Sequence, residues 1–242
     1  SEPQRPSAAL TGAILRKGLP MGAQMLVMST AGLTMVGLVN RLGVDTAAAY
    51  AVSQQLWTYI QMPALAIGAA VSSMAAQNIG AGRWDRVGDI TKYGLIFNVA
   101  LTGTMVLAVI LFDRPVMTLF VPDTSPALPI ARHIQLIASW NFIVFGATMV
   151  LFSTVRANGA VLMPLLFLFV SMYPVRIGFA LAAQGWLGSD AIWWSFPAGS
   201  VANLVMAIGY YRYGNWRKGS LAVPHEERET IAEPAGRLQP SG

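Results

Sequence analysis

Residues 46–82 read TAAAYAVSQQLWTYIQMPALAIGAAVSSMAAQNIGAG and contain no Lys, Arg, Asp or Glu. About 20 apolar residues in a helix cross the hydrocarbon core of a bilayer, so this stretch can span a membrane and continue beyond it. Pro63 interrupts the stretch. Because a proline inside a helix removes a hydrogen bond to the preceding turn, we expect a bend there.

The first half of this stretch carries polar side chains that lipid cannot satisfy. Gln54 and Gln61 lie seven positions apart, and Gln55 and Tyr59 lie four apart, so one broad helical face can carry most of them. Polar groups inside a bilayer must face protein or water. We therefore predict that this helix lines a cavity.

The composition is that of a membrane protein. The chain is 55% hydrophobic and 11% charged, with a mean hydropathy of +0.53, whereas soluble domains carry about 25% charged residues. The net charge of +5 is spread in small groups between apolar runs, so we expect no nucleic-acid partner. The absence of cysteine removes disulfides and thiolate metal sites.

The apolar runs predict an all-α, polytopic fold with six transmembrane helices. Pro20 falls near the start of the first span, where a missing N–H is tolerated. Residues 116–121 are too short to span and are expected at the membrane interface. The fifth span is broken at Pro174. The predicted spans cover residues 18–39, 46–68, 92–112, 134–155, 161–183 and 191–211.

The basic residues predict the orientation. With the N-terminus in the cytoplasm, ten Lys and Arg flank the spans on the inside and three on the outside, which favours cytoplasmic termini in a plasma (inner) membrane. We expect a cytoplasmic linker (residues 1–12), a six-helix lobe (13–214) and a disordered cytoplasmic tail (215–242). Because the chain begins without Met, we interpret it as a piece of a longer protein or a processed chain.

Enzymatic residues are scarce. His133 and His225 are the only histidines and stand far apart in the sequence, so we expect no metal, no catalytic triad and no cofactor. No Asp or Glu lies inside a predicted span. Carriers driven by a proton or cation gradient usually need a buried carboxylate, which we therefore expect elsewhere.

Arg176 is the one charge well inside a predicted span. A central Arg needs a partner or a hydrated cavity. Two roles stay open for it: it bonds the carbonyls freed near Pro174 or reaches the interface, or it binds a ligand.

An ordered set of landmarks resembles the C-terminal half of the multidrug and toxic compound extrusion transporters, over about residues 12–218. These landmarks are Gly18-Leu19-Pro20, Ala76-Gln77-Asn78-Ile79-Gly80-Ala81-Gly82-Arg83, Arg156-Ala157-Asn158-Gly159, Pro174 with Arg176, Ile192-Trp193-Trp194 and Asn215-Trp216-Arg217-Lys218. The resemblance implies one lobe of a twelve-helix, two-lobe carrier that exports drug-like, often cationic compounds in exchange for H+ or Na+. The partners would be small-molecule substrates, membrane lipids and either the missing N-terminal lobe or a second copy.

The chain departs from that pattern in two places. The sodium-coupled branch has a carboxylate on the first span of this lobe, where this chain has Val27-Met28-Ser29. The turn that usually reads Gly-Ala-Gly-Asp is Ala157-Asn158-Gly159-Ala160. From the polar spans and the resemblance together, we expect substrates to meet hydrogen-bonding and aromatic groups at Gln24, Gln54, Gln55, Tyr59, Trp140, Asn141 and Arg176.

Two other functions share the same architecture. A flippase for lipid-linked oligosaccharides would need a strongly cationic cavity for pyrophosphate, and only Arg176 is available within a span. A self-associating membrane scaffold would use the small-residue faces and transport nothing.

Overall fold

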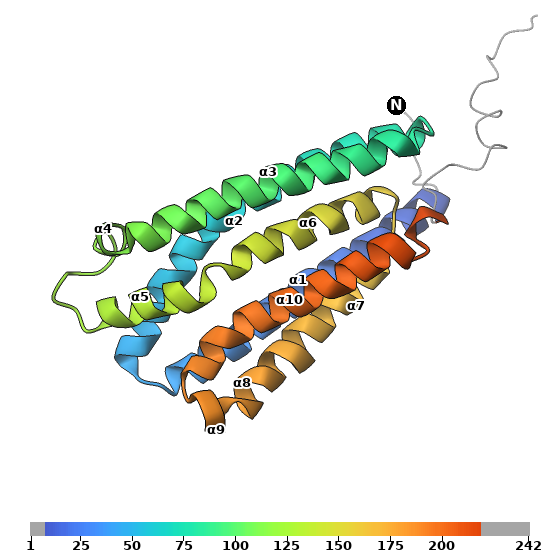
Figure 1. Cartoon of the computed structure of the whole chain (residues 1–242). Helices are drawn as coiled ribbons and strands as arrows, with labels where there is room; N and C mark the ends of the chain where they lie inside the picture. Colours follow the sequence, from blue (N-terminus) through green and yellow to red (C-terminus); the bar gives the residue numbers. More distant parts are fainter. Residues whose placement is uncertain (1–7, 219–242) are drawn as a thin grey trace, which may run out of the picture.

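The computed structural model describes residues 8–218, and throughout this range the regular structure is helical (Figure 1). The predicted all-α fold is confirmed. The elements are α1 (Ala8–Asn40), α2 (Val44–Gly80), α3 (Trp84–Leu111), α4 (Asp113–Met117), α5 (Ala127–Ala138), α6 (Asn141–Ala157), α7 (Leu162–Val170), the π-helix η1 (Ser171–Ile177), α8 (Gly178–Ala182), α9 (Gln184–Leu187), α10 (Asp190–Tyr213) and the 3-10 helix η2 (Trp216–Lys218).

Five helical segments are long and apolar enough to cross a membrane: α1, α2, α3, the continuous run Leu162–Ala182, and α10. A sixth span results if α5 and α6 count as one helix, which is bent by 45° at its break. The start of α1 and the end of α10 lie at the same end of the bundle (Figure 1), as an even number of membrane crossings requires. The chain is thus a multi-pass membrane protein.

Several boundaries differ from the predicted ones. Helix α1 begins at Ala8, so Pro20 lies inside the helix and not in its first turn. The predicted loop after the third span contains α4 and the first turn of α5, and Met117 within it is fully buried. At the other end, Trp216 is buried although the tail was expected to begin at residue 215. Residues 1–7 and 219–242 of the expected linker and tail lie outside the described range.

Prolines shape two of the spans differently. Helix α2 continues through Pro63 without a break, and its two ends run in different directions (Figure 1), in agreement with the expected bend. At Pro174 the chain adopts the wider π-helix η1 before returning to α-helix. A π-helical turn inside an α-helix accommodates the missing N–H and often marks a functional position.

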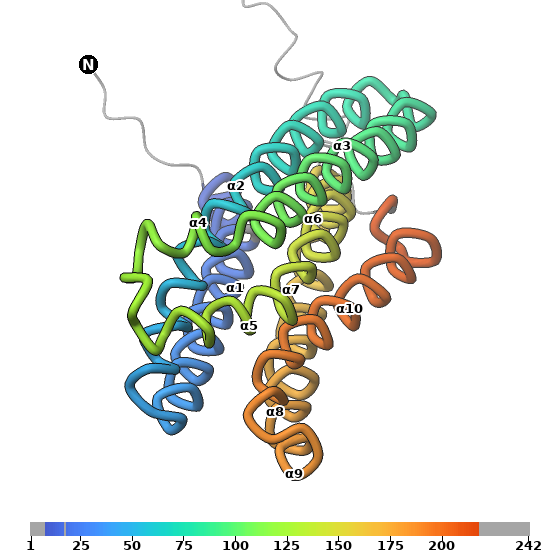
Figure 2. Tube along the Cα trace, turned by 60° about the vertical axis from the view of Figure 1, so that its left-hand side comes forward, coloured from blue at the N-terminus to red at the C-terminus, as the bar shows by residue number. Residues whose placement is uncertain are grey.

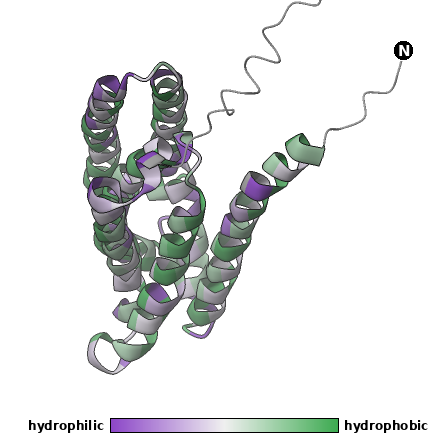
Figure 3. Ribbon diagram, turned by 90° about the vertical axis from the view of Figure 1, so that its right-hand side faces the viewer, coloured by the Kyte–Doolittle hydropathy of each residue, from purple (hydrophilic) through white to green (hydrophobic). Residues whose placement is uncertain are grey.

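The helices form two groups. Helices α2, α3 and α6 pack on one another, and α6 also packs on α10, which lies on its far side from α3 (Figure 2). Helices α1, α7 and α10 form the second group (Figure 1). The hydropathic colouring shows apolar residues along the helices and polar residues gathered at the turns (Figure 3). Many large apolar side chains are exposed, such as Leu33 and Phe97, as expected of a surface that contacts lipid.

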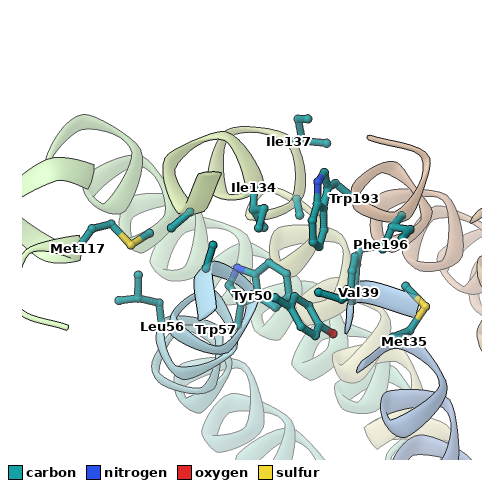
Figure 4. Packing of buried hydrophobic residues seen from close by; sticks show 14 of the residues in the cluster. Met35, Val39, Tyr50, Leu56, Trp57, Met117, Ile134, Ile137, Trp193 and Phe196 are labelled. Carbon is teal, nitrogen blue, oxygen red and sulfur yellow. The ribbon is translucent and has the colours of Figure 1, made fainter. Parts of the chain in front are cut away.

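An aromatic cluster fills the junction between the groups (Figure 4). The ring of Trp57 lies 5.1 Å from Phe196 and 5.4 Å from Phe142, measured between centroids. Tyr50 lies 5.7 Å from Trp193. Because such pairs add to the free energy of burying large rings, this cluster holds α2, α6 and α10 together.

The α3–α6 contact depends on a glycine. A Cβ at Gly146 would lie 2.0 Å from Oδ1 of Asn98, which is fully buried and accepts a hydrogen bond from Thr102 at 3.1 Å. The same α3–α6 interface contains Gly103, where a Cβ would meet only Ile143 at 3.9 Å.

We predict that Gly146→Ala destabilises the protein by about 1–3 kcal/mol, the usual cost of overpacking a filled interior. Thermal unfolding of the purified protein in detergent measures the change. Gly103→Ala is the matched control and should leave the melting temperature nearly unchanged. Equal effects of the two substitutions would contradict this packing.

Candidate functional site

A cavity of about 250 Å³ lies between α1, α2, α6, α7, η1 and α10. Aromatic and apolar side chains form much of its wall, including Trp57, Phe142, Phe145 and Phe196. Polar groups converge on it from four of these elements, namely Tyr50, Gln54, Thr58, Gln61, Asn141, Thr148, Ser171, Arg176, Ser200 and Asn203. An apolar cavity with a few convergent polar groups is the usual form of a small-molecule site.

Helix α2 lines the cavity with a single face. Tyr50, Gln54, Trp57, Thr58 and Gln61 all contact it, and their spacing of three and four places them on one side of a helix. The expected pair Gln54 and Gln61 thus shares one face.

Two predicted residues on α2 lie elsewhere. Gln55 and Tyr59 are exposed, Tyr59 by 54%, and neither belongs to the cavity lining. The prediction that one face carries most of these polar residues is wrong for this pair, because a shift of one position turns a side chain by about 100° around a helix.

The break between α5 and α6 positions Asn141. Its Nδ2 donates a hydrogen bond to the carbonyl of Ala138, and its Oδ1 accepts one from Ser200 Oγ of α10 at 2.9 Å. Asn141 therefore lines the cavity, as predicted, and also links two spans. Trp140 is half-buried against the aromatic cluster and Gln24 is half-buried on α1, and neither lines the cavity.

Arg176 enters the cavity from the π-helix. Its Nη1 donates to the thioether of Met172 at 3.0 Å, and its Cζ lies 3.8 Å from the centroid of the Phe196 ring. Its Nε is buried and has no hydrogen-bond partner. None of the ion pairs within residues 8–218 includes Arg176. The guanidinium therefore faces the cavity without a carboxylate.

Glycine brings α10 close to this arginine. A Cβ at Gly199 would lie 3.1 Å from the carbonyl oxygen of Ser171 and 3.4 Å from Cβ of Arg176. The next turn of α10 presents Asn203, whose Oδ1 is also buried without a partner. Close packing of α10 on η1 thus places two unsatisfied polar groups around one cavity.

Sequence reasoning missed the contribution of α10. Phe196, Gly199, Ser200 and Asn203 follow the i, i+3, i+4, i+7 pattern and all line the cavity. This periodicity was the available signal. The periodicity is hard to recognise in the sequence, because the remaining residues of α10 are also largely apolar or small and no polar face contrasts with an apolar one.

The titratable residues form no metal site within residues 8–218, where no group of three or more His, Asp or Glu side chains could hold an ion. His133 instead lies 2.9 Å from Asp190, nitrogen to oxygen, and connects α5 to α10.

This architecture, with five long apolar helices, a sixth span if α5 and α6 count as one, and a cavity between them, is that of a multi-pass membrane protein. The MatE family model matches residues 20–182. The chain is 31% identical over 207 residues to the probable multidrug resistance protein YoeA of Bacillus subtilis, and 30% identical over 217 residues to YpnP of the same organism. The chain therefore belongs to the MatE family of multidrug and toxic compound extrusion proteins.

The matches cover most of this chain and about half of each relative: 85% against 44% for YoeA and 90% against 48% for YpnP. The probable multidrug resistance protein NorM of Thermotoga maritima is 22% identical over 219 residues. A crystal structure of MATE in the bent conformation shares the fold with a TM-score of 0.75 at 20% identity, covering 88% of this chain and 47% of that one. The chain spans about half the length of the curated relatives it matches.

The cavity wall also depends on a hydrogen bond from Trp57 Nε1 to Gln135 Oε1 of 3.2 Å, with both side chains buried. We predict that Gln135→Leu destabilises the protein by about 1–3 kcal/mol, because it leaves the indole N–H unpaired. In a double-mutant cycle by thermal unfolding, adding Trp57→Phe to Gln135→Leu should cost clearly less than Trp57→Phe alone. Strict additivity would mean that the bond contributes nothing.

Proposed function

We propose that this chain forms one lobe of a secondary exporter that moves drug-like, amphipathic compounds across the membrane in exchange for H+ or Na+. The observation that supports this most directly is the cavity lined by six elements of the lobe, in a chain that belongs to the MatE family. The three relatives named above are probable multidrug resistance proteins.

The cavity chemistry fits such substrates. Aromatic rings of Trp57, Phe142 and Phe196 offer stacking surfaces, and amide and hydroxyl groups of Gln54, Asn141 and their neighbours offer hydrogen bonds. A few polar groups in a largely apolar wall bind molecules that have both an apolar body and a polar end. Of the expected substrate-binding residues, Gln54, Asn141 and Arg176 are therefore our primary candidates.

Transport requires more than this lobe. Alternating access in such carriers proceeds by rocking of two repeats around a site near the midplane, and the chain covers about half of its relatives. We propose that a second lobe, either an N-terminal lobe or a second copy of this chain, completes the pathway. A role for Gln24, Gln55, Tyr59 and Trp140, which do not line the cavity, would depend on that partner.

The coupling carboxylate is proposed to lie outside the described cavity wall. None of the lining residues is Asp or Glu, and a wall without a carboxylate cannot exchange a proton or hold Na+ through one. Orientation with cytoplasmic termini in the inner membrane follows from the basic residues and belongs to the same proposal.

The function is tested by reconstituting the full-length parent protein in liposomes and imposing a proton or sodium gradient. We predict gradient-dependent movement of a fluorescent drug-like dye. Gln54→Ala should reduce the rate, because it removes a cavity hydrogen bond, whereas Gln77→Ala, an exposed glutamine on the same helix, should not. Dye movement that is independent of both gradients would contradict the proposal.

Pro63 is predicted to matter for the transport rate. Pro63→Ala restores a backbone N–H inside α2 and should straighten the helix, so transport should slow while expression is maintained. Met62→Ala changes an exposed neighbouring side chain without altering the backbone and serves as the control. An unchanged rate in Pro63→Ala would show that the bend has no part in transport.

A further inference from the structure

Arg176 is the only ionisable side chain with a fixed charge among the residues that line the cavity, and no lining residue is acidic. The cavity therefore carries a net positive charge. Exporters of cationic compounds would be expected to have a negatively charged cavity. In this cavity a cationic ligand would instead be repelled by Arg176, and the low dielectric constant of the interior strengthens that repulsion.

The existing contacts of Arg176 leave hydrogen-bonding capacity unused. A guanidinium has five N–H donors. One reaches the sulfur of Met172, a weak acceptor, and the contact with the Phe196 ring supplies no acceptor lone pair. The Nε–H has no partner. A buried charge in this state is incompletely compensated and is stabilised strongly by an arriving anion.

A carboxylate fits these donors better than a pyrophosphate does. A carboxylate and a guanidinium form two parallel charge-assisted hydrogen bonds, and one carboxylate neutralises one Arg. A pyrophosphate carries more charge than a single guanidinium balances. The aromatic wall around Trp57 and Phe142 suits a flat apolar body.

We propose that this cavity is a binding site for amphipathic aromatic carboxylates, with the carboxylate on Arg176 and the ring against the aromatic wall. This inference rests on the proposed function and narrows its substrate class from drug-like compounds in general to organic acids and zwitterions. Arg176 is then a specificity-determining residue, because it selects the charge of the ligand.

The test compares three ligands that share one ring system: indoleacetate, which is anionic, indoleacetamide, which is neutral, and tryptamine, which is cationic. Binding to the purified full-length parent protein is measured by equilibrium dialysis. We expect indoleacetate to bind most tightly and tryptamine most weakly. Arg176→Gln should weaken indoleacetate binding by about 10- to 100-fold, the range of a hydrogen bond to a charged group, without weakening tryptamine binding.

Two further variants keep the test decisive. Arg176→Lys retains the positive charge but cannot form the two parallel hydrogen bonds of a guanidinium, so it should bind indoleacetate with an affinity between those of the wild type and Arg176→Gln. If Arg176→Gln does not fold, Arg176→Lys still tests the role of the guanidinium. Arg41→Gln removes an exposed arginine outside the cavity and should bind like the wild type. Retained binding in a folded Arg176→Gln protein, or tighter binding of tryptamine than of indoleacetate by the wild type, would overturn the inference.

Other outcomes separate this inference from the proposed function. Gradient-driven export of a cationic dye together with no Arg176-dependent binding of indoleacetate would refute the inference alone. Binding of indoleacetate that depends on Arg176, in a protein that transports nothing under either gradient, would refute the proposed function alone. If inorganic pyrophosphate displaces bound indoleacetate at a concentration lower than that of indoleacetate itself, the site prefers a phosphate ligand, and the assignment of a carboxylate site is overturned.

Discussion

The burial of one guanidinium inside a membrane-spanning lobe is the constraint on which the rest of the structure depends. A charged side chain at the centre of a transmembrane helix costs about 2.5–3.5 kcal/mol on insertion scales. The fold meets this cost with local devices: the π-helix around Pro174 turns Arg176 inward, Phe196 lies against its Cζ, and Gly199 lets α10 approach η1 closely. The aromatic cluster then closes one side of the resulting cavity.

The same arrangement explains why the cavity lies within one lobe. Helix α6 contacts both helix groups, and its break from α5 places Asn141 where it bonds Ser200 of α10. Hydrogen bonds between spans satisfy polar groups that lipid cannot satisfy. The remaining polar groups of the cavity stay available to a ligand. These contacts between spans place the lining residues of α2, α6 and α10 around one cavity.

Sequence reasoning predicted the spans well because hydropathy directly reflects the bilayer. The charge-free stretch 46–82 and the six apolar runs follow from composition and spacing, and so does the presence of one charge, Arg176, within a span. The sequence did not show that Gln54 lines the cavity while Gln55 does not, because the apolar residues around this helix leave no contrast that marks the buried face. Pro174 predicted a break in the fifth span but not its π-helical form, and the 45° break between α5 and α6 was not predicted.

The central claim is that ligands bind inside this lobe, beside Arg176. Photolabelling the purified parent protein with azidobenzoate, an aromatic carboxylate, and mapping the adducts by mass spectrometry tests it most directly. We expect adducts on the cavity-facing residues of α2, η1 and α10, such as Trp57, Met172 and Phe196, and we expect an excess of unlabelled benzoate to prevent them. Adducts confined to the exposed surface of α3, or to parts of the parent protein outside residues 8–218, would contradict it.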